Sequence, residues 1–146
     1  MFTIENATIK DLFTLRQLEK ECFAIDAWPL VDLAGVLVLP GIIRMKAVHE
    51  NKMVGFIAGN IGATDGIGWI STIGVIQLAR RQGIGKALLA AFEDRIITPE
   101  LRLTVRKSNL GAIQMYLQNG YQNYQIWENY YQGGEDGQVM RKLRVR

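Results

Sequence analysis

The sequence contains very little of the two residue types that most often bind transition metals or act as nucleophiles, with one cysteine and one histidine among 146 residues. A single cysteine, Cys22, excludes an internal disulfide framework and makes a reduced, cytoplasmic compartment the default expectation. A nucleophilic cysteine would need a base, but His49 lies in "AVHENKMVGF", which has the form of a hairpin turn. We therefore expect a structural role for Cys22 and no metal site.

Long apolar runs and a strong excess of one charge are absent as well. The stretch "LAGVLVLPGII" covers only 11 residues and contains Pro40, and the start "MFTIENATIK" lacks the apolar core of a signal peptide. The 17 basic and 14 acidic residues give a net charge of +3, too small an excess to indicate a nucleic-acid partner. Neither a membrane nor a nucleic acid is therefore an expected partner.

Apolar periodicity predicts strands and helices along the whole chain. Thr8 and Asp11 have the spacing of a capping box at the start of the first helix, whose apolar positions are Ile9, Leu12, Phe13, Leu15 and Leu18. The expected elements are a strand at 2–7, helices at 8–23 and 30–39, a hairpin at 42–61 around "HENK", a strand at 67–76, a helix at 83–97, a strand at 101–106, a helix at 109–119, and strands at 121–127 and 138–143.

This order of hairpins and helical crossovers predicts an α/β (α+β) fold, with one mixed sheet and helices on both of its faces. A chain of 146 residues fits one domain, and no repeat, low-complexity segment or linker interrupts it. We therefore expect a single domain that covers residues 1–146.

The stretch "GVIQLARRQGIGKALLAAFEDRI" places two arginines and two glycines where a strand passes into a helix. The first amides of a helix lack internal partners and carry partial positive charge, so that a phosphate or pyrophosphate is their natural ligand. Gly83 and Gly85 leave room for its approach, while Arg80, Arg81 and Lys86 can neutralise its charge. Because the spacing fits neither a nucleotide P-loop nor the dinucleotide fingerprint, a plain turn with solvated arginines is the alternative.

The following segment, "LTVRKSNLGAIQMYLQNGY", adds a second feature. It places Asn109, Ala112 and Tyr116 on one helical stripe. Asn109 and Tyr116 would then lie roughly 10 Å apart along the helix axis. That separation suits contact with an extended ligand arm.

Together these two segments resemble the GNAT family of acetyl-CoA-dependent N-acetyltransferases, with the first matching its pyrophosphate-binding motif and the second the strand and helix that follow. Near the ends, "ECFAIDAWP" and "ENYYQGGEDGQVMRKL" resemble the ribosomal-protein alanine N-acetyltransferases, although Gly137 stands where their final hairpin usually has alanine. The resemblance covers nearly all of the chain. It implies the GNAT fold, with a mostly antiparallel sheet of about seven strands, and an enzyme with acetyl-CoA as co-substrate.

The resemblance also implies roles for individual residues. A backbone amide near Val75 would stabilise the thioester oxygen, and Tyr116 would protonate the leaving CoA thiolate. Gly74 would permit a ligand to approach the strand closely, or it is a packing compromise in a buried strand. The alternative for Tyr116 is an ordinary core tyrosine. The implied acetyl-CoA-binding residues are Ile73, Val75, Arg80, Arg81, Gly83, Ile84, Gly85, Lys86, Asn109 and Tyr116.

The general base of the family has no counterpart at its usual positions. Thr104 stands where the ribosomal-protein enzymes carry a glutamate, and Trp69 stands where some eukaryotic relatives carry a tyrosine. The remaining candidates are Asp26, Glu21, Glu128 or an ordered chain of water. An α-amino group with a pKa of about 7.7 is about one-sixth neutral at pH 7, whereas a lysine amine near 10.4 is neutral about once in 2,500, so an α-amine hardly needs a base.

The expected acceptor is therefore the N-terminal α-amine of a protein or peptide, with a ribosomal protein as one candidate and a monomer or homodimer as the expected assembly. Trp28, Tyr130 and Tyr131 correspond to residues on the acceptor side of the family, although the two tyrosines alternatively form an exposed aromatic pair at a strand end. Two other functions remain open: a GNAT enzyme that acetylates a small amine, and a non-catalytic module that binds acyl-CoA.

Overall fold

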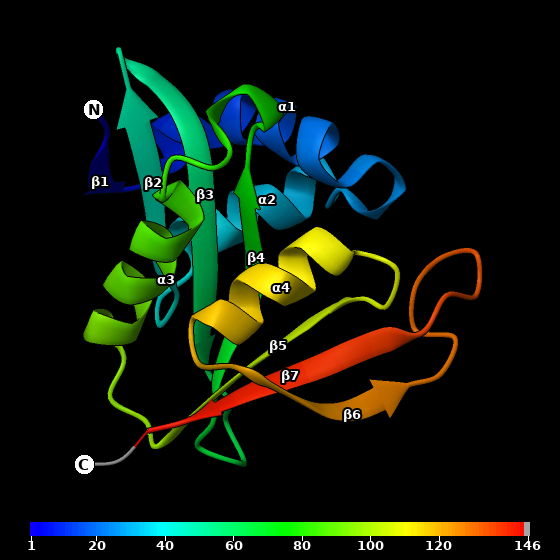
Figure 1. Cartoon of the computed structure of the whole chain (residues 1–146). Helices are drawn as coiled ribbons and strands as arrows, with labels where there is room; N and C mark the ends of the chain where they lie inside the picture. The colour runs from blue at the N-terminus through cyan, green and yellow to red at the C-terminus, as the bar shows by residue number, and fades with distance from the viewer. Residues whose placement is uncertain (145–146) are drawn as a thin grey trace. The chain divides into compact units, whose positions relative to one another are not determined.

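The computed structural model describes residues 1–144. Its strands and helices follow the order that the sequence predicts (Figure 1). They are β1 (Thr3–Asn6), α1 (Leu12–Phe23), α2 (Leu30–Val38), β2 (Ile43–His49), β3 (Lys52–Ile61), β4 (Gly68–Val75), α3 (Ile84–Arg95), β5 (Glu100–Arg106), α4 (Leu110–Gln118), β6 (Gln122–Trp127) and β7 (Gly137–Leu143). Short 3-10 helices cover Ile9–Asp11, Ala24–Asp26 and Gln77–Ala79. Within residues 1–144, no helix is both long and apolar enough to cross a membrane.

The strands form a seven-stranded sheet in the order β1-β2-β3-β4-β5-β7-β6. The β1–β2, β2–β3, β5–β7 and β6–β7 pairings are antiparallel, whereas β4 and β5 pair in parallel. The prediction of a mixed, mostly antiparallel sheet of about seven strands is confirmed. The chain forms two compact units, which are unit 1 (residues 1–60 and 71–97) and unit 2 (residues 61–70 and 98 onward).

The helical segment at the start of unit 1 opens with the capping box that the sequence predicts. The Lys10 N–H donates a hydrogen bond to the Thr8 hydroxyl at 3.3 Å, and the Thr8 N–H donates to Asp11 Oδ2 at 2.8 Å. These bonds satisfy amides that have no partner inside a helix. The capped turn, Ile9–Asp11, is a 3-10 helix that leads directly into α1.

One face of β3 packs against α1 and α2. The buried cluster there contains Leu15, Leu18, Leu33, Val36, Leu37, Phe56 and Ala58. Ile9 and Phe13, which belong to the predicted apolar stripe, are nevertheless 48% and 71% exposed. The buried face of the first helical segment is therefore narrower than its sequence pattern indicates.

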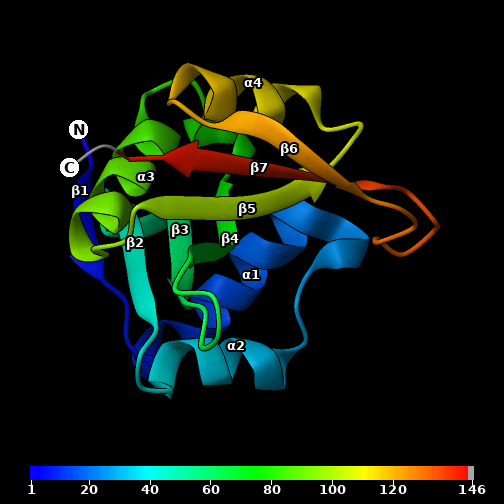
Figure 2. The ribbon, with the colours of Figure 1, turned by 90° about the horizontal axis from the view of Figure 1, so that it is seen from below.

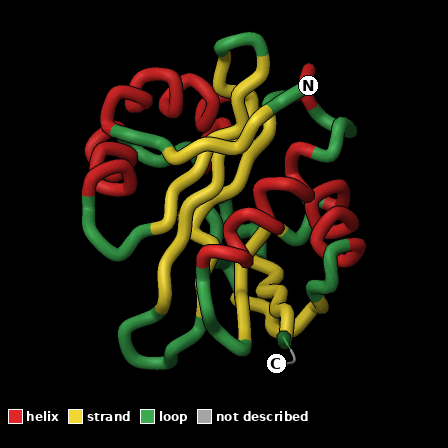
Figure 3. Tube along the Cα trace, turned by 90° about the vertical axis from the view of Figure 1, so that its left-hand side faces the viewer, coloured by secondary structure: helices red, strands yellow, loops and turns green. Residues whose placement is uncertain are grey.

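The opposite face of β3 packs against α3. A Cβ atom built at Gly55 would lie 3.0 Å from Leu88 Cδ1 and 3.1 Å from Ile84 Cγ2, so the helix contacts the strand backbone directly. Because successive strand residues point to opposite faces, β3 serves two helical layers at once. Within unit 1, helices therefore lie on both faces of the sheet, as predicted, and Figure 3 shows them on either side of the strands.

In unit 2, strands β5, β7 and β6 lie side by side (Figures 1 and 2). Leu101, Leu103 and Val105 are buried, and the residues between them on β5 are only half-buried, which is the alternation of a strand with one face in a core. The side chains of β6 are mostly exposed because β6 is an edge strand. Helix α4 belongs to the same unit, and its Tyr116 ring meets Tyr121 edge to face, with centroids 6.1 Å apart.

Candidate functional site

Glycine at position 74 allows α1 to pack closely against the end of β4 in unit 1. A Cβ atom there would lie 3.1 Å from Cys22 Sγ, 3.2 Å from Phe23 Cζ and 3.3 Å from Cys22 Cβ. This crowding supports the packing interpretation of Gly74. Burial raises the pKa of the Cys22 thiol to about 11, although nearby Arg80 opposes the shift. Cys22 is therefore a half-buried thiol with little thiolate character, as its expected structural role requires.

The loop that follows β4 is held by side chains of unit 1. The Gln77 N–H donates to Glu21 Oε2 at 3.0 Å, and Arg80 Nε donates to the Val75 carbonyl at 2.9 Å. These bonds fix the backbone that leads from the end of β4 to α3. Glu21, one of the candidate bases, is thus a hydrogen-bond acceptor for this loop.

The start of α3 is open to an anion. Gly83 is its N-cap, has φ +81°, makes no side-chain capping bond, and offers open space where a Cβ atom would stand. Arg81 also has a positive φ, of +64°, and both Arg81 and Lys86 are exposed. Because Ile84 and Gly85 are buried, only their backbone amides could contact a ligand. Uncapped amides flanked by exposed cations fit a pyrophosphate group.

The side chain of Tyr116 on α4 is buried. The residue is only 5% exposed, and burial raises the pKa of its phenol, with a smaller contribution from Tyr131, so the proton stays bound at neutral pH. Among residues 1–144, no fully buried side-chain oxygen lacks a hydrogen-bond partner.

Asn109 has a local structural role that the sequence pattern did not indicate. It is the N-cap of α4, with φ −81° and ψ 73°, and its Oδ1 accepts a hydrogen bond from the Ala112 N–H at 3.2 Å. The helix therefore begins one residue later than predicted. The side-chain amide of Asn109 remains the group that could donate to a ligand.

Unit 2 also contains a row of four aromatic rings in contact, of which Trp69 and Trp127 are stacked and Tyr130 and Tyr131 meet edge to face. The centroid distances are 5.9 Å from Trp69 to Trp127, 5.0 Å from Trp127 to Tyr130, and 4.9 Å from Tyr130 to Tyr131. Tyr130 is 54% exposed. The sequence offered an exposed aromatic pair as the alternative for Tyr130 and Tyr131, but it did not indicate that two tryptophans from distant strands continue the row.

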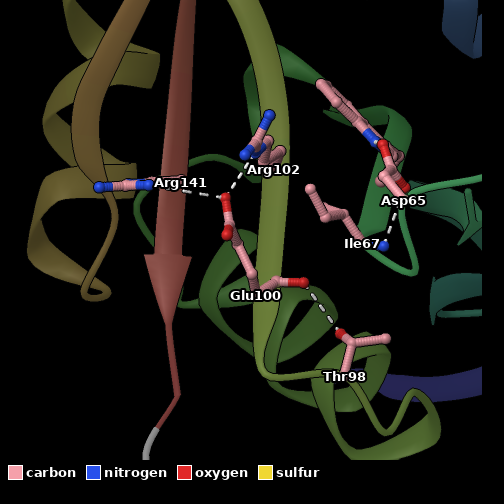
Figure 4. A network of polar contacts seen from close by, with 7 residues as sticks. Asp65, Ile67, Thr98, Glu100, Arg102 and Arg141 are labelled. Atoms are coloured by element: carbon pink, nitrogen blue, oxygen red, sulfur yellow. Dashed lines mark hydrogen bonds and ion pairs between the residues drawn. The ribbon is translucent and has the colours of Figure 1, made fainter.

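Polar contacts hold Trp69 in this row. Trp69 Nε1 donates to Asp65 Oδ2 at 3.5 Å, and the Arg102 guanidinium lies 5.8 Å from the Trp69 ring centroid. Figure 4 shows Asp65 accepting from the Ile67 N–H, and Glu100 between Arg102 and Arg141. The bond from Ile67 lowers the pKa of the Asp65 carboxyl below its ordinary value. Trp69 cannot accept a proton from the substrate, because its indole nitrogen is not basic and its N–H already donates to Asp65.

Two of the departures from the family pattern in unit 2, Thr104 and Gly137, are physically linked. Thr104 and Gly137 lie on the paired strands β5 and β7. A Cβ atom at Gly137 would stand 2.9 Å from Thr104 Cγ2 and 3.2 Å from Tyr130 Cδ2. The space that alanine would need at position 137 is thus taken by the β-branched Thr104 and by the Tyr130 ring.

A buried carboxylate that the sequence analysis missed lies in unit 1. Glu19 is 1% exposed, accepts a hydrogen bond from the Thr72 hydroxyl at 2.8 Å, and accepts another from the Trp28 N–H at 3.3 Å. Burial raises the pKa of Glu19, and these two bonds oppose the shift. The spacing of Glu19 from Leu12 and Leu15 puts it on the apolar face of α1, and this spacing could have predicted its burial. Glu19 fixes Trp28 to strand β4.

The predicted site residues occur in both units. Unit 1 holds Trp28, Ile73, Val75, Arg80, Arg81, Gly83, Ile84, Gly85 and Lys86, and unit 2 holds Asn109, Tyr116, Tyr130 and Tyr131. Within unit 1, the hydrogen bond from Arg80 to the Val75 carbonyl joins the strand end to the cationic loop. Within unit 2, Tyr130 and Tyr131 are in direct ring contact.

Comparisons with known proteins identify the family of the chain. Residues 10–121 match the acetyltransferase (GNAT) family. The chain is 29% identical to N-alpha-acetyltransferase 20 of Dictyostelium discoideum, over 100% of this chain and 88% of that protein. It is 36% identical to the N-terminal acetyltransferase B complex catalytic subunit NAA20 of Arabidopsis thaliana, over 73% of this chain and 65% of that protein.

The structural comparison covers the entire chain. The crystal structure of the ribosomal-protein-S18-alanine N-acetyltransferase from Escherichia coli superimposes with a TM-score of 0.86 and 27% identity, and the match covers 100% of this chain and 96% of that one. The family match spans well over half of the chain. This protein therefore belongs to the acetyltransferase (GNAT) family, whose members transfer the acetyl group of acetyl-CoA.

Proposed function

We propose that this protein transfers the acetyl group of acetyl-CoA directly to the N-terminal α-amine of a protein or peptide. The observation that carries the proposal is the match to N-terminal acetyltransferases along most or all of the chain, together with the end-to-end likeness to an enzyme that acts on a ribosomal protein. Residues 1–146 act as one acetyltransferase domain in this proposal, either as a monomer or as a homodimer.

The start of α3 binds the pyrophosphate of acetyl-CoA. The open position at Gly83 and the backbone amides of Ile84, Gly85 and Lys86 support this role, because they offer donors that no side chain of the helix start satisfies. The other groups that contact acetyl-CoA in this proposal are the cationic side chains of Arg80, Arg81 and Lys86, the strand residues Ile73 and Val75, and the side-chain amide of Asn109.

Two residues act on the reacting atoms. The Val75 N–H donates to the thioester oxygen as that oxygen becomes negative. The Tyr116 hydroxyl donates its proton to the CoA sulfur as the thiolate leaves. The raised pKa of Tyr116 supports this role, because a phenol that stays protonated at neutral pH can serve as an acid.

On the acceptor side, Trp28, Tyr130 and Tyr131 cover the first residues of the peptide. Thr104 and Trp69 provide no basic group at the usual positions of the base. Glu21 accepts a hydrogen bond from the Gln77 N–H in the loop after β4. An amine that is already partly neutral is therefore the favoured acceptor, and a protein α-amine meets this condition at pH 7 whereas lysine does not. A ribosomal protein is one candidate acceptor.

The test is an acetylation screen with the purified protein and acetyl-CoA. One arm uses peptides with each of the 20 residues at the first position, and the other uses spermidine, an aminoglycoside and free amino acids. We expect α-acetylated peptides as the main products. Faster acetylation of a small amine would show that the acceptor is a small molecule and not a peptide. Binding of acetyl-CoA without turnover of any amine would support a non-catalytic module.

A further inference from the structure

The carboxylate of Glu19 is buried in unit 1 without a cation beside it. The residue is 1% exposed, and among residues 1–144 no lysine, arginine or histidine forms an ion pair with it. Its two oxygens accept one hydrogen bond each, from the Thr72 hydroxyl and from the Trp28 N–H. An ionised carboxylate has only acceptors, so these two donors match it.

Stability alone does not account for a carboxylate at this position. Removal of a carboxylate from water is costly, and apolar side chains of similar volume often replace buried charged groups without loss of stability. Glu19 lies on α1 beside the buried Leu15 and Leu18, so an apolar residue there would simply extend their face. An apolar residue could not supply two directed acceptors, and these acceptors join two separate segments of the chain.

One of these segments is the connection between α1 and α2, residues 24–29 (Figure 2). Ala24 in this connection has φ 49° and ψ −111°, a conformation that a non-glycine residue keeps only when its surroundings impose it. The Ala27 N–H donates to the Ala24 carbonyl at 3.1 Å, which closes a turn. The bond from the Trp28 N–H to Glu19 then ties the end of this turn to α1.

The same connection forms one wall of a cleft of about 600 Å³ beside α2. Residues 26–29 line the cleft, and Trp28 among them is half-buried. The main chain at Trp28 is thus fixed by Glu19 while the residue itself remains partly exposed. This is the arrangement that a preformed binding wall requires, because the order of the wall then comes from a buried group behind it.

We propose that Glu19 is a positioning residue for acceptor binding, which fixes the main chain at Trp28 against Thr72 of β4 before the peptide arrives. The proposal rests on the proposed function, because it takes Trp28 as a residue that covers the acceptor. Glu19 is buried, so it acts through Trp28 and touches neither the acceptor nor acetyl-CoA. A connection that is already ordered loses less conformational entropy when the peptide binds.

Glu19→Met tests this role, because it keeps the length of the side chain and removes both acceptors. We expect kcat/KM for an acceptor peptide to fall about tenfold, and the Kd for acetyl-CoA in calorimetry to change less than about twofold. Glu19→Gln keeps an oxygen for the Trp28 N–H and offers its amide to the Thr72 hydroxyl, so it should retain most of the wild-type kcat/KM. The matched control is Glu50→Met in the exposed turn after β2, which removes the same charge and should have no effect.

Two further measurements show whether Glu19 acts through Trp28. In hydrogen exchange followed by mass spectrometry, residues 24–29 should exchange at least about tenfold faster in Glu19→Met than in the wild type. Trp28→Ala removes the ring but keeps the main-chain N–H, so Glu19→Met should cause little further loss of kcat/KM when it is added to Trp28→Ala. Thermal unfolding checks that each variant is folded. If Glu19→Met does not fold, Thr72→Val removes the anchor on β4 and should lower the peptide kcat/KM in the same selective way.

The positioning role and the proposed function fail in different ways. If the wild type acetylates no peptide on its α-amine, the proposed function is wrong and the positioning role falls with it. If peptides are acetylated and Glu19→Met has wild-type kcat/KM or unchanged exchange at residues 24–29, the function stands and the positioning role alone is wrong. Equal losses for peptide and acetyl-CoA, no recovery in Glu19→Gln, or additive losses in the double variant would also overturn it, since a general weakening of the fold produces these results.

Discussion

Replacing Gly74 by alanine should disturb both the packing and the chemistry of unit 1. The new methyl group would lie 3.1–3.3 Å from Cys22 Sγ, Cys22 Cβ and Phe23 Cζ, whereas carbon atoms pack best at about 3.5–4.0 Å. Relief of these contacts requires β4 and the last turn of α1 to separate by roughly 0.3–0.7 Å. Overpacking of this kind typically costs about 1–3 kcal/mol. The melting temperature should fall by about 4–12 °C, taking about 4 °C per kcal/mol.

The same displacement moves the neighbouring Val75 amide. Because a misplacement of about 1 Å can cost about 100-fold in rate, a shift of roughly 0.3–0.7 Å should lower kcat by about 4- to 25-fold. Steady-state kinetics and thermal unfolding measure the two effects. Cys22→Ala removes the closest contact, so it should restore part of both losses when combined with Gly74→Ala.

Gly111→Ala is the matched control. Gly111 lies in α4, and a Cβ atom there would meet nothing within 4 Å. Alanine should stabilise the helix by up to about 1 kcal/mol and leave kcat unchanged. Wild-type stability and kcat in Gly74→Ala would refute the reasoning, since they would mean that α1 and β4 separate without cost.

Three further substitutions test separate residues. Tyr116→Phe should lower kcat by about 100- to 10,000-fold with little change in the KM for acetyl-CoA, and a near-normal kcat in steady-state assays would exclude Tyr116 as the acid. Because burial raises the pKa of Glu19 above its ordinary value of 4.5, its ionisation opposes folding, and wild-type stability should fall as pH rises from about 4.5 to the higher folded-state pKa. Glu19→Gln should lack this fall when free energies of unfolding are compared across pH, and identical pH profiles would contradict the assignment. Asn109→Ala should cost about 1 kcal/mol in urea unfolding through loss of its capping bond, and an unchanged midpoint would show that the cap contributes nothing.

The order of elements was predictable because each depends on local signals. The "HENK" turn is an example: Glu50 and Asn51 both have positive φ, of 51° and 63°, as a two-residue hairpin loop requires. The capping box at Thr8 and Asp11 is another, since its bonds join residues three apart. Such features need no knowledge of distant contacts.

Features that depend on distant contacts could not be predicted in the same way. Glu19 accepts a hydrogen bond from Thr72, 53 positions away, and a charged residue on a helix is ordinarily solvated. The need for glycine at position 74 comes from Cys22 and Phe23 on another element. Asn109 is an intermediate case, because its capping bond is local but its sequence context also fits a ligand contact.

The most direct test of the central claim compares two peptides of matched sequence at pH 7. One has a free α-amine and no lysine, and the other has a blocked α-amine and one lysine, with fragmentation mass spectrometry locating the acetyl group. The neutral fractions of about one-sixth and about one in 2,500 differ about 400-fold. We predict that the α-amine peptide is acetylated at least about 100-fold faster, with a rate that levels off near pH 8. Equal rates at pH 7, or acetylation of the lysine alone, would contradict an enzyme that acts on protein N-termini.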